Sequence, residues 1–140
     1  MNLLVTATIS TIAVLSSFNN ETQYTKSDLL DAICQVESDC DSGAVGDGGD
    51  SIGAYQIQWA YWYDAVEFSG IDGDYETVLN KEYAREIVLA YWNRYATKKR
   101  LGHEPTLEDF ARIHNGGPNG YKKESTVKYW EKTKNIMGLE

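Results

Sequence analysis

Glu37 is the residue best suited to acid–base chemistry, because it ends an apolar helical stretch and directly precedes a loop rich in Gly and Asp. The negative end of a helix dipole disfavours a nearby carboxylate, and burial against aromatic side chains would add to that effect. A carboxyl group that keeps its proton near neutral pH can serve as a general acid. The alternative is a Glu37 that faces water and has no chemical role.

A second carboxylate could come from the loop after Glu37, which contains Asp39, Asp41, Asp47 and Asp50. Asp47 follows Glu37 by ten residues. A chain of that length can return to the separation of about 5–9.5 Å found between paired glycosidase carboxylates. The pattern therefore points to hydrolysis of a glycosidic bond. The alternative is that these acids form turns or bind calcium.

Other reaction types find little support in the sequence. It contains no phosphate-binding motif of the form GxxxxGK[ST] or GxGxxG, and acids near the Gly-rich stretch 43–49 would repel phosphate. His103 and His114 could join a Ser-His-Asp triad, but no GxSxG motif supports one. Cys34 and Cys40 have no second ligand pair at zinc spacing, so neither a metal site nor a cofactor is expected.

Cys34 and Cys40 are the two cysteines of the chain, and in an exported protein they could pair. In a continuous helix they would lie about 9 Å apart along the axis, whereas a disulfide needs Cα atoms within about 7 Å. A disulfide would therefore require the helix to end near Ser38 or Asp39. Two free thiols are the alternative.

The elements that would position these residues are mostly helical. A capping box of Thr25 and Asp28 precedes apolar residues at helical spacing, which predicts a helix over 26–38. Further along we expect a strand at 52–57, an aromatic helix at 59–68 and a long helix at 75–99. After these we expect a short helix that begins with Thr106 and Asp109, and a turn at 114–120. The last predicted element is an amphipathic helix that carries Val127, Trp130 and Met137. We expect the four tryptophans to lie in the core. Together these elements predict an α+β fold that is mostly helical and has a small, segregated sheet.

The chain has 140 residues, the size of one domain, and we expect this domain over 25–138 behind a flexible leader at 18–24. Residues 1–17 are uncharged and contain an apolar run, which predicts a secretory signal peptide. The alternative is an uncleaved membrane anchor, although the run is short against the roughly 20 apolar residues of a span. No later segment is apolar enough to cross a bilayer, so no stable membrane association is expected.

The net charge of −8 argues against a nucleic-acid partner, since phosphate contacts need a basic surface. The charge is also uneven along the chain. Residues 1–80 hold one base and 13 acids, whereas residues 81–140 hold 12 bases and 8 acids. Glu37 therefore lies in the acidic half, where clustered carboxylates help to hold one of their number protonated.

Five segments of the chain occur in the order found in a known enzyme family. Residues 33–40, ICQVESDC, resemble its active-site helix, and residues 51–57, SIGAYQI, resemble the strand that follows. Residues 60–65, AYWYDA, are similar to its YWxD stretch, residues 111–120, ARIHNGGPNG, to its HNGGPxG turn, and Tyr129-Trp130 to its closing helix. The chain thus resembles the invertebrate-type (i-type, destabilase-like) lysozymes over roughly residues 30–137.

The resemblance implies a lysozyme-like fold with a small β-hairpin after the catalytic helix. It implies cleavage of the β-1,4 bond between N-acetylmuramic acid and N-acetylglucosamine, by a protein that is secreted or works in a digestive compartment. Glu37 would be the general acid, with Asp47 as the first choice and Asp50 as the second choice for the other carboxylate. The substrate, peptidoglycan or a chito-oligosaccharide, would contact Ser51, Tyr55, Gln56, His114 and Asn115.

Two alternatives, one departure from the family and one possible side activity accompany this resemblance. The ES…GxYQI…NGGPxG pattern also resembles lytic transglycosylases, which use one Glu and no second carboxylate, and a non-catalytic glycan-binding module on the same scaffold is a further alternative. The family is usually rich in cysteine, whereas this chain keeps only the pair that flanks Glu37. Some members also cleave isopeptide bonds through a Ser-centred site, for which Ser51 and His114 are the candidates here.

Overall fold

The computed structural model describes residues 23–139, so the expected signal peptide at 1–17 and most of the expected leader lie outside the described residues. The fold is α+β and mostly helical, as predicted. Its elements in chain order are α1 (Lys26–Ser38), β1 (Val45–Gly46), the 3-10 helix η1 (Asp47–Gly49), β2 (Ser51–Ile52), β3 (Ile57–Gln58), α2 (Trp59–Ser69), η2 (Tyr75–Leu79), α3 (Lys81–Tyr95), α4 (Lys98–Leu101), α5 (Leu107–Gly116), η3 (Gly120–Lys122), η4 (Glu124–Thr126) and α6 (Val127–Met137).

Local sequence signals set both ends of helix α1. At its start the Thr25 side chain accepts from the Asp28 N–H at 3.3 Å, and the Asp28 carboxylate accepts from the Thr25 N–H at 2.7 Å, which confirms the predicted capping box. At its end Asp39 and Cys40 adopt left-handed backbone conformations, with φ of 53° and 60°. This turn brings the Cα atoms of Cys34 and Cys40 to 4.6 Å, and their sulfur atoms form a disulfide. The prediction that a disulfide requires the helix to end between the cysteines is confirmed.

A small antiparallel sheet in the order β1-β2-β3 follows α1. The prediction of a single strand over 52–57 is wrong, because residues 53–56 form the turn between β2 and β3. Gly53 makes this turn possible. Its φ is +80°, and a Cβ at this position would lie 2.7 Å from the carbonyl oxygen of Val78.

The prediction of one long helix over 75–99 is also wrong, since this region forms three segments, η2, α3 and α4. Asn80 has an extended backbone, and its side-chain oxygen accepts from the Tyr83 N–H at 2.9 Å, so it begins α3. Thr97 begins α4 in the same way, accepting from the Arg100 N–H at 3.4 Å. Asn and Thr side chains compete with helical backbone hydrogen bonds, and apolar periodicity does not reveal that competition.

The segment from α5 to α6 contains the second predicted capping box, which Thr106 and Asp109 form at the start of α5. Helix α5 continues through Gly116, so the turn predicted at 114–120 begins only after Gly116. Gly120 lies against Arg112 so closely that a Cβ at Gly120 would overlap the Arg112 carbonyl. Glycine at this position therefore lets η3 and η4 fold back toward α5 before α6 begins.

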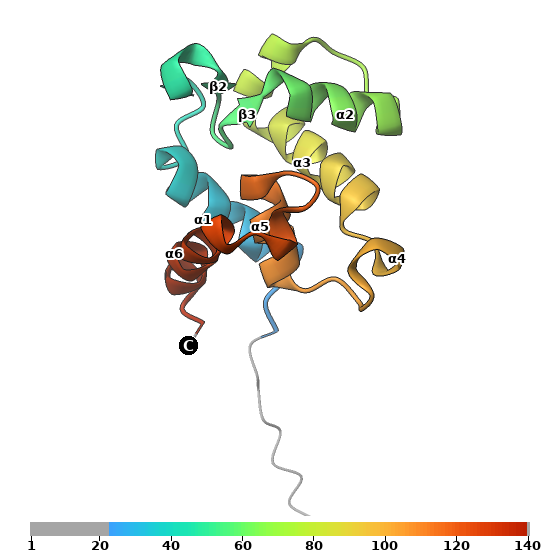
Figure 1. Ribbon diagram of the computed structural model, residues 1–140. Coiled ribbons are helices and arrows are strands. Elements are labelled where there is room, and N and C mark those ends of the chain that lie inside the picture. Colours follow the sequence, from blue (N-terminus) through green and yellow to red (C-terminus); the bar gives the residue numbers. More distant parts are fainter. Residues whose placement is uncertain (1–22, 140) are drawn as a thin grey trace, which may run out of the picture.

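The helices form two groups that meet in the middle of the molecule. Figure 1 shows α1, α5 and α6 in the lower part, and the sheet with α2 and α3 in the upper part. Helix α3 also packs against α5 and so joins the two groups. Trp92 of α3 is fully buried in the core, as predicted for the tryptophans, but the same prediction is wrong for Trp59 of α2, which is 55% exposed.

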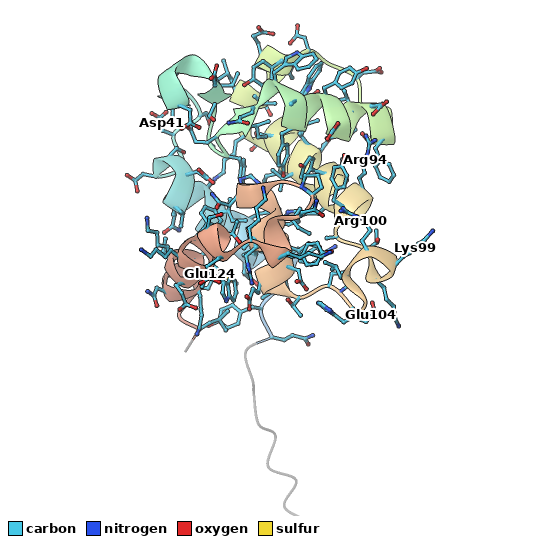
Figure 2. The ribbon with its side chains drawn as sticks, in the orientation of Figure 1. Asp41, Arg94, Lys99, Arg100, Glu104 and Glu124 are labelled. Atoms are coloured by element: carbon cyan, nitrogen blue, oxygen red, sulfur yellow. A yellow bond between two sulfur atoms is a disulfide. The ribbon has the colours of Figure 1, made fainter. Side chains whose placement is uncertain are left out.

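Charged side chains cover the outside of the fold. Asp41, Lys99 and Glu104 project from its periphery in Figure 2. Arg94 bridges α3 to α2, with its guanidinium 2.8 Å from a carboxylate oxygen of Glu67.

Across residues 23–139, no helix has both the length and the apolar character needed to cross a membrane.

Candidate active site

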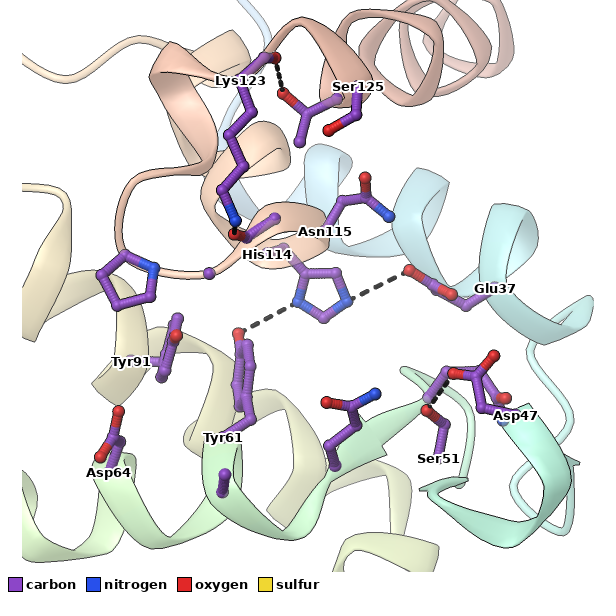
Figure 3. Close-up of a pocket in the computed structure, with 17 residues that line it drawn as sticks. Glu37, Asp47, Ser51, Tyr61, Asp64, Tyr91, His114, Asn115, Lys123 and Ser125 are labelled. Atoms are coloured by element: carbon purple, nitrogen blue, oxygen red, sulfur yellow. Dashed lines mark hydrogen bonds and ion pairs between the residues drawn. The ribbon is translucent and has the colours of Figure 1, made fainter.

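A cleft of about 610 Å³ lies where the two groups of helices meet, and Figure 3 shows the side chains that line it. It is lined by the end of α1, the sheet region, α2, the end of α5 and the segment that leads into α6. The lining residues are Glu37, Asp47, Ser51, Gln56, Gln58, Ala60, Tyr61, Asp64, Tyr91, His114, Asn115, Gly116, Gly117, Pro118, Lys123, Ser125 and Thr126.

Glu37 lies in the last turn of α1 with its side chain 18% exposed. Its Oε1 atom accepts a hydrogen bond from the Tyr129 hydroxyl at 2.8 Å and lies 3.4 Å from Nε2 of His114. Among residues 23–139, no donor is within hydrogen-bond distance of Oε2. One oxygen of this carboxyl is therefore held by the protein, and the other remains available to a substrate.

His114 is held between two fixed partners. Its Nε2 lies 3.1 Å from the Tyr55 carbonyl oxygen, and its Nδ1 lies 3.0 Å from the Tyr61 hydroxyl. Because a carbonyl oxygen can only accept, Nε2 carries the hydrogen, and in the neutral ring Nδ1 accepts from Tyr61. The ring is also 3% exposed, so His114 has one orientation in the wall of the cleft.

The two tyrosines in this network stay protonated through neutral pH. Burial raises the pKa of Tyr61 well above its ordinary value, and the nearby Tyr91 and Glu37 raise it further. Burial also raises the pKa of Tyr129 well above its ordinary value, and the charge of Glu37 and the hydrogen bond to it add to that effect. Both hydroxyl groups therefore act as hydrogen-bond donors.

Asp47 enters the cleft from η1, on the same side as Ser51. It has a left-handed backbone with φ of 52°, and its carboxylate accepts a hydrogen bond from the Ser51 hydroxyl at 2.6 Å. Figure 3 shows Asp47 and Glu37 on facing elements of the cleft. Asp50 does not line the cleft, and its backbone carbonyl accepts from the Tyr75 hydroxyl at 3.4 Å. The structure thus brings the first-choice carboxylate to Glu37 and leaves the second choice outside.

Four of the five residues expected to contact a sugar line the cleft: Ser51, Gln56, His114 and Asn115. Tyr55 does not, and the expectation that its side chain contacts the sugar needs correction. Its ring is fully buried, and its hydroxyl accepts from the Arg85 guanidinium at 3.1 Å. Its position in the tight turn after Gly53 points the ring into the core, and only its carbonyl reaches the site, through His114.

Sequence reasoning missed several residues of the site. Tyr61 and Asp64 are three residues apart on α2, and this helical spacing could have indicated that they share one face. Lys123, Ser125 and Tyr129 had no comparable signal, because they reach the site only through the packing of the last segments of the chain. The described residues contain no group of three or more His, Cys, Asp or Glu side chains placed to hold a metal ion.

This arrangement can perform acid–base chemistry on a polymer that lies along an open cleft. It presents one carboxyl oxygen with no hydrogen-bond donor among residues 23–139, a second carboxylate held by a serine hydroxyl, and amide and hydroxyl groups able to hydrogen-bond a polar chain. Most glycosidases hydrolyse a glycosidic bond with a pair of carboxyl groups that flank it.

Comparison with known proteins identifies close relatives of this chain. The family model described as Destabilase matches residues 26–136. The chain is 41% identical over 106 residues to Lysozyme 1 of Crassostrea virginica, which covers 74% of this chain but 55% of that protein. It is 33% identical over 121 residues to Invertebrate-type lysozyme 6 of Caenorhabditis elegans, which covers 81% of this chain and 88% of that protein.

Solved structures show the same likeness in three dimensions. The lysozyme of Meretrix lusoria, in a crystal structure with PliI of Aeromonas hydrophila, superposes with a TM-score of 0.68 at 36% identity. The match covers 81% of this chain and 93% of the chain in that structure.

Proposed function

This chain belongs to the Destabilase family of invertebrate-type lysozymes, and we propose that it hydrolyses the β-1,4 bond between N-acetylmuramic acid and N-acetylglucosamine in peptidoglycan. The observation that carries the proposal is Glu37. It ends α1 inside the cleft with Oε1 held by Tyr129 and with Oε2 free of protein donors among the described residues. A protonated Oε2 can meet the oxygen of a glycosidic bond that lies along the cleft.

The reaction follows from the two carboxyl groups. Glu37 donates its proton to the leaving glycosidic oxygen as the sugar develops positive charge at its anomeric carbon. The Asp47 carboxylate faces this charge, as a nucleophile or as a stabilising anion. Glu37, now a carboxylate, then takes a proton from water as water adds to the anomeric carbon, which restores the starting state.

Ser51 and His114 support these two groups in different ways. The Ser51 hydroxyl donates to Asp47 at 2.6 Å and limits the directions in which this exposed carboxylate can turn. His114 is held by Tyr61 and by the Tyr55 carbonyl, so it presents a fixed polar edge beside Glu37. Asn115 and Gln56 line the same cleft. Asn115 offers its amide group to the N-acetyl substituents of the sugar, whereas the Gln56 amide nitrogen donates to the Ala44 and Gly53 carbonyls.

The position of Asp47 favours hydrolysis over lytic transglycosylation. A transglycosylase with one Glu needs no second carboxylate, whereas here Asp47 lines the same cleft as Glu37 and is held by a hydrogen bond. Product analysis separates the two reactions. A reducing N-acetylmuramic acid end supports hydrolysis, and a 1,6-anhydro end would reject it.

The main test compares lysis of Gram-positive cell walls by the wild type and by Glu37→Gln. We expect the variant to lose about 100-fold or more in rate, the usual contribution of a positioned general acid. Glu86→Gln is a matched control, because Glu86 is an exposed glutamate on α3 that does not line the cleft. A Glu37→Gln variant as active as Glu86→Gln would reject the proposed acid. A wild type that binds walls without lysing them would instead indicate a glycan-binding module.

We propose that the protein acts outside the cell or in a digestive compartment. The disulfide between Cys34 and Cys40 supports this location, since disulfides persist in oxidising surroundings. Detection of the mature chain in culture medium, beginning after residues 1–17, would test both the location and the expected signal peptide.

A further inference from the structure

We propose that Tyr129 is a positioning residue, which holds Oε1 of Glu37 as an acceptor and so leaves Oε2 as the oxygen that carries and delivers the catalytic proton. This inference rests on the proposed function, because it assigns a task to the atoms of the proposed acid. It concerns a residue from the last helix, 92 positions away in the sequence.

The contact between Tyr129 and Glu37 is short and shielded. The Tyr129 hydroxyl lies 2.8 Å from Oε1, and Tyr129 is 8% exposed. Within the described part of the chain this is the single hydrogen bond that the Tyr129 hydroxyl makes. The hydroxyl donates and the carboxyl oxygen accepts, since a tyrosine buried in this way keeps its proton at neutral pH.

The His114 ring lies beside the same oxygen. Its Nε2–H points toward the Tyr55 carbonyl at 3.1 Å and lies 3.4 Å from Oε1 of Glu37. A proton on Oε1 would leave the Tyr129 hydroxyl hydrogen without its acceptor. Buried donors without acceptors are costly, so the proton belongs on Oε2.

Groups from every neighbouring element bear on the charge of Glu37. Tyr129 approaches from α6, His114 from α5 and Tyr61 from α2, while Asp47 shares the cleft from η1. Tyr61 acts on Glu37 through His114, because its hydroxyl bonds to Nδ1 of that ring. Among residues 23–139, Tyr129 alone donates a hydrogen bond directly to the carboxyl group.

Tyr129 should affect the chemical step and not the binding of substrate. It does not line the cleft, so its loss should leave KM unchanged while kcat falls about tenfold or more, because a misoriented acid delivers its proton poorly.

The test is Tyr129→Phe in the full chain, with Tyr121→Phe as a matched control. Tyr121 also lies outside the cleft and donates from a partly buried hydroxyl, but to the Arg100 carbonyl at 3.1 Å and not to Glu37. We would measure kcat and KM on a soluble chito-oligosaccharide, together with Tm. The expected result is a lower kcat with an unchanged KM in Tyr129→Phe alone.

Each other outcome overturns the inference. A wild-type kcat in Tyr129→Phe would show that the hydroxyl is dispensable, and a lower Tm with changes in both kcat and KM would show a structural role. Sugar binding at the wild-type KM shows that the variant is folded. Glu37→Gln, measured in parallel, separates the two proposals. If it stays active, the proposed function fails, whereas an inactive Glu37→Gln beside a wild-type-like Tyr129→Phe rejects only the role of Tyr129.

Discussion

Breaking the disulfide between Cys34 and Cys40 should lower the stability of the protein without changing how Glu37 is held. The cysteines are six residues apart. In the chain-entropy model, closing such a short loop contributes about 2–2.5 kcal/mol to the free energy of unfolding. In a domain of this size a change of about 1 kcal/mol corresponds to about 4 °C in Tm, so Tm should fall by about 8–10 °C.

The active site should survive this loss because backbone hydrogen bonds also hold the end of α1. The Asp39 N–H donates to the Gln35 carbonyl at 3.1 Å, and the Cys40 N–H donates to the Cys34 carbonyl at 2.9 Å. These bonds close the last turn around Glu37 without help from the sulfur atoms. We therefore expect kcat at 25 °C to stay close to that of the oxidised protein.

The assay is thermal unfolding of the oxidised and the reduced wild type, followed by circular dichroism. The reduced protein keeps both sulfur atoms, so it isolates the cross-link from packing. A Cys34→Ala, Cys40→Ala variant should be less stable still, because Cys34 is fully buried and its truncation leaves a cavity. Equal Tm in the two redox states would refute the loop-entropy reasoning. A large loss of kcat far below Tm would show that the backbone alone does not hold Glu37.

Three further predictions concern the cleft and the surface charge. Asp47→Asn should lower wall lysis by about 100-fold, the scale of removing one electrostatic contact from a transition state, whereas Asp50→Asn should retain it because Asp50 lies outside the cleft. Full activity in both variants would favour a mechanism with Glu37 alone. Ser51→Ala removes the 2.6 Å hydrogen bond to Asp47 and should reduce kcat/KM about tenfold, as expected for a bond to a charged group, and an unchanged value would refute this role. Since walls are anionic and the net charge is −8, turbidity assays at constant ionic strength should show faster lysis at mildly acidic pH, and a rate that only rises from pH 5 to pH 8 would contradict this.

Errors in the sequence-based elements arose where a side chain interrupts a regular pattern. The apolar residues between 75 and 99 repeat at helical spacing, yet Asn80 and Thr97 accept backbone hydrogen bonds that divide the region. The apolar residues between 52 and 57 suggest a strand, yet Gly53 adopts a left-handed conformation and turns the chain. In both regions periodicity was present, but local hydrogen bonds and backbone freedom determined the elements.

By itself the sequence determined the features that depend on neighbouring residues. The capping boxes at Thr25 and Thr106, the end of α1 after Glu37 and the placement of a carboxylate-rich loop beyond it all follow from side chains a few positions apart. Hydrogen bonds over three or four residues form in almost any surroundings, which is why these features could be predicted.

The tertiary structure decided how the site is completed. Packing of α6 against α1 brings the Tyr129 hydroxyl to Glu37, and packing of α5 near α2 gives His114 its Tyr61 partner. The tertiary structure also places Asp47 in the cleft and Asp50 outside it, and it buries the Tyr55 ring in the core. Contacts between residues so far apart in the chain depend on how whole helices fill a shared core, and no short sequence pattern encodes that arrangement.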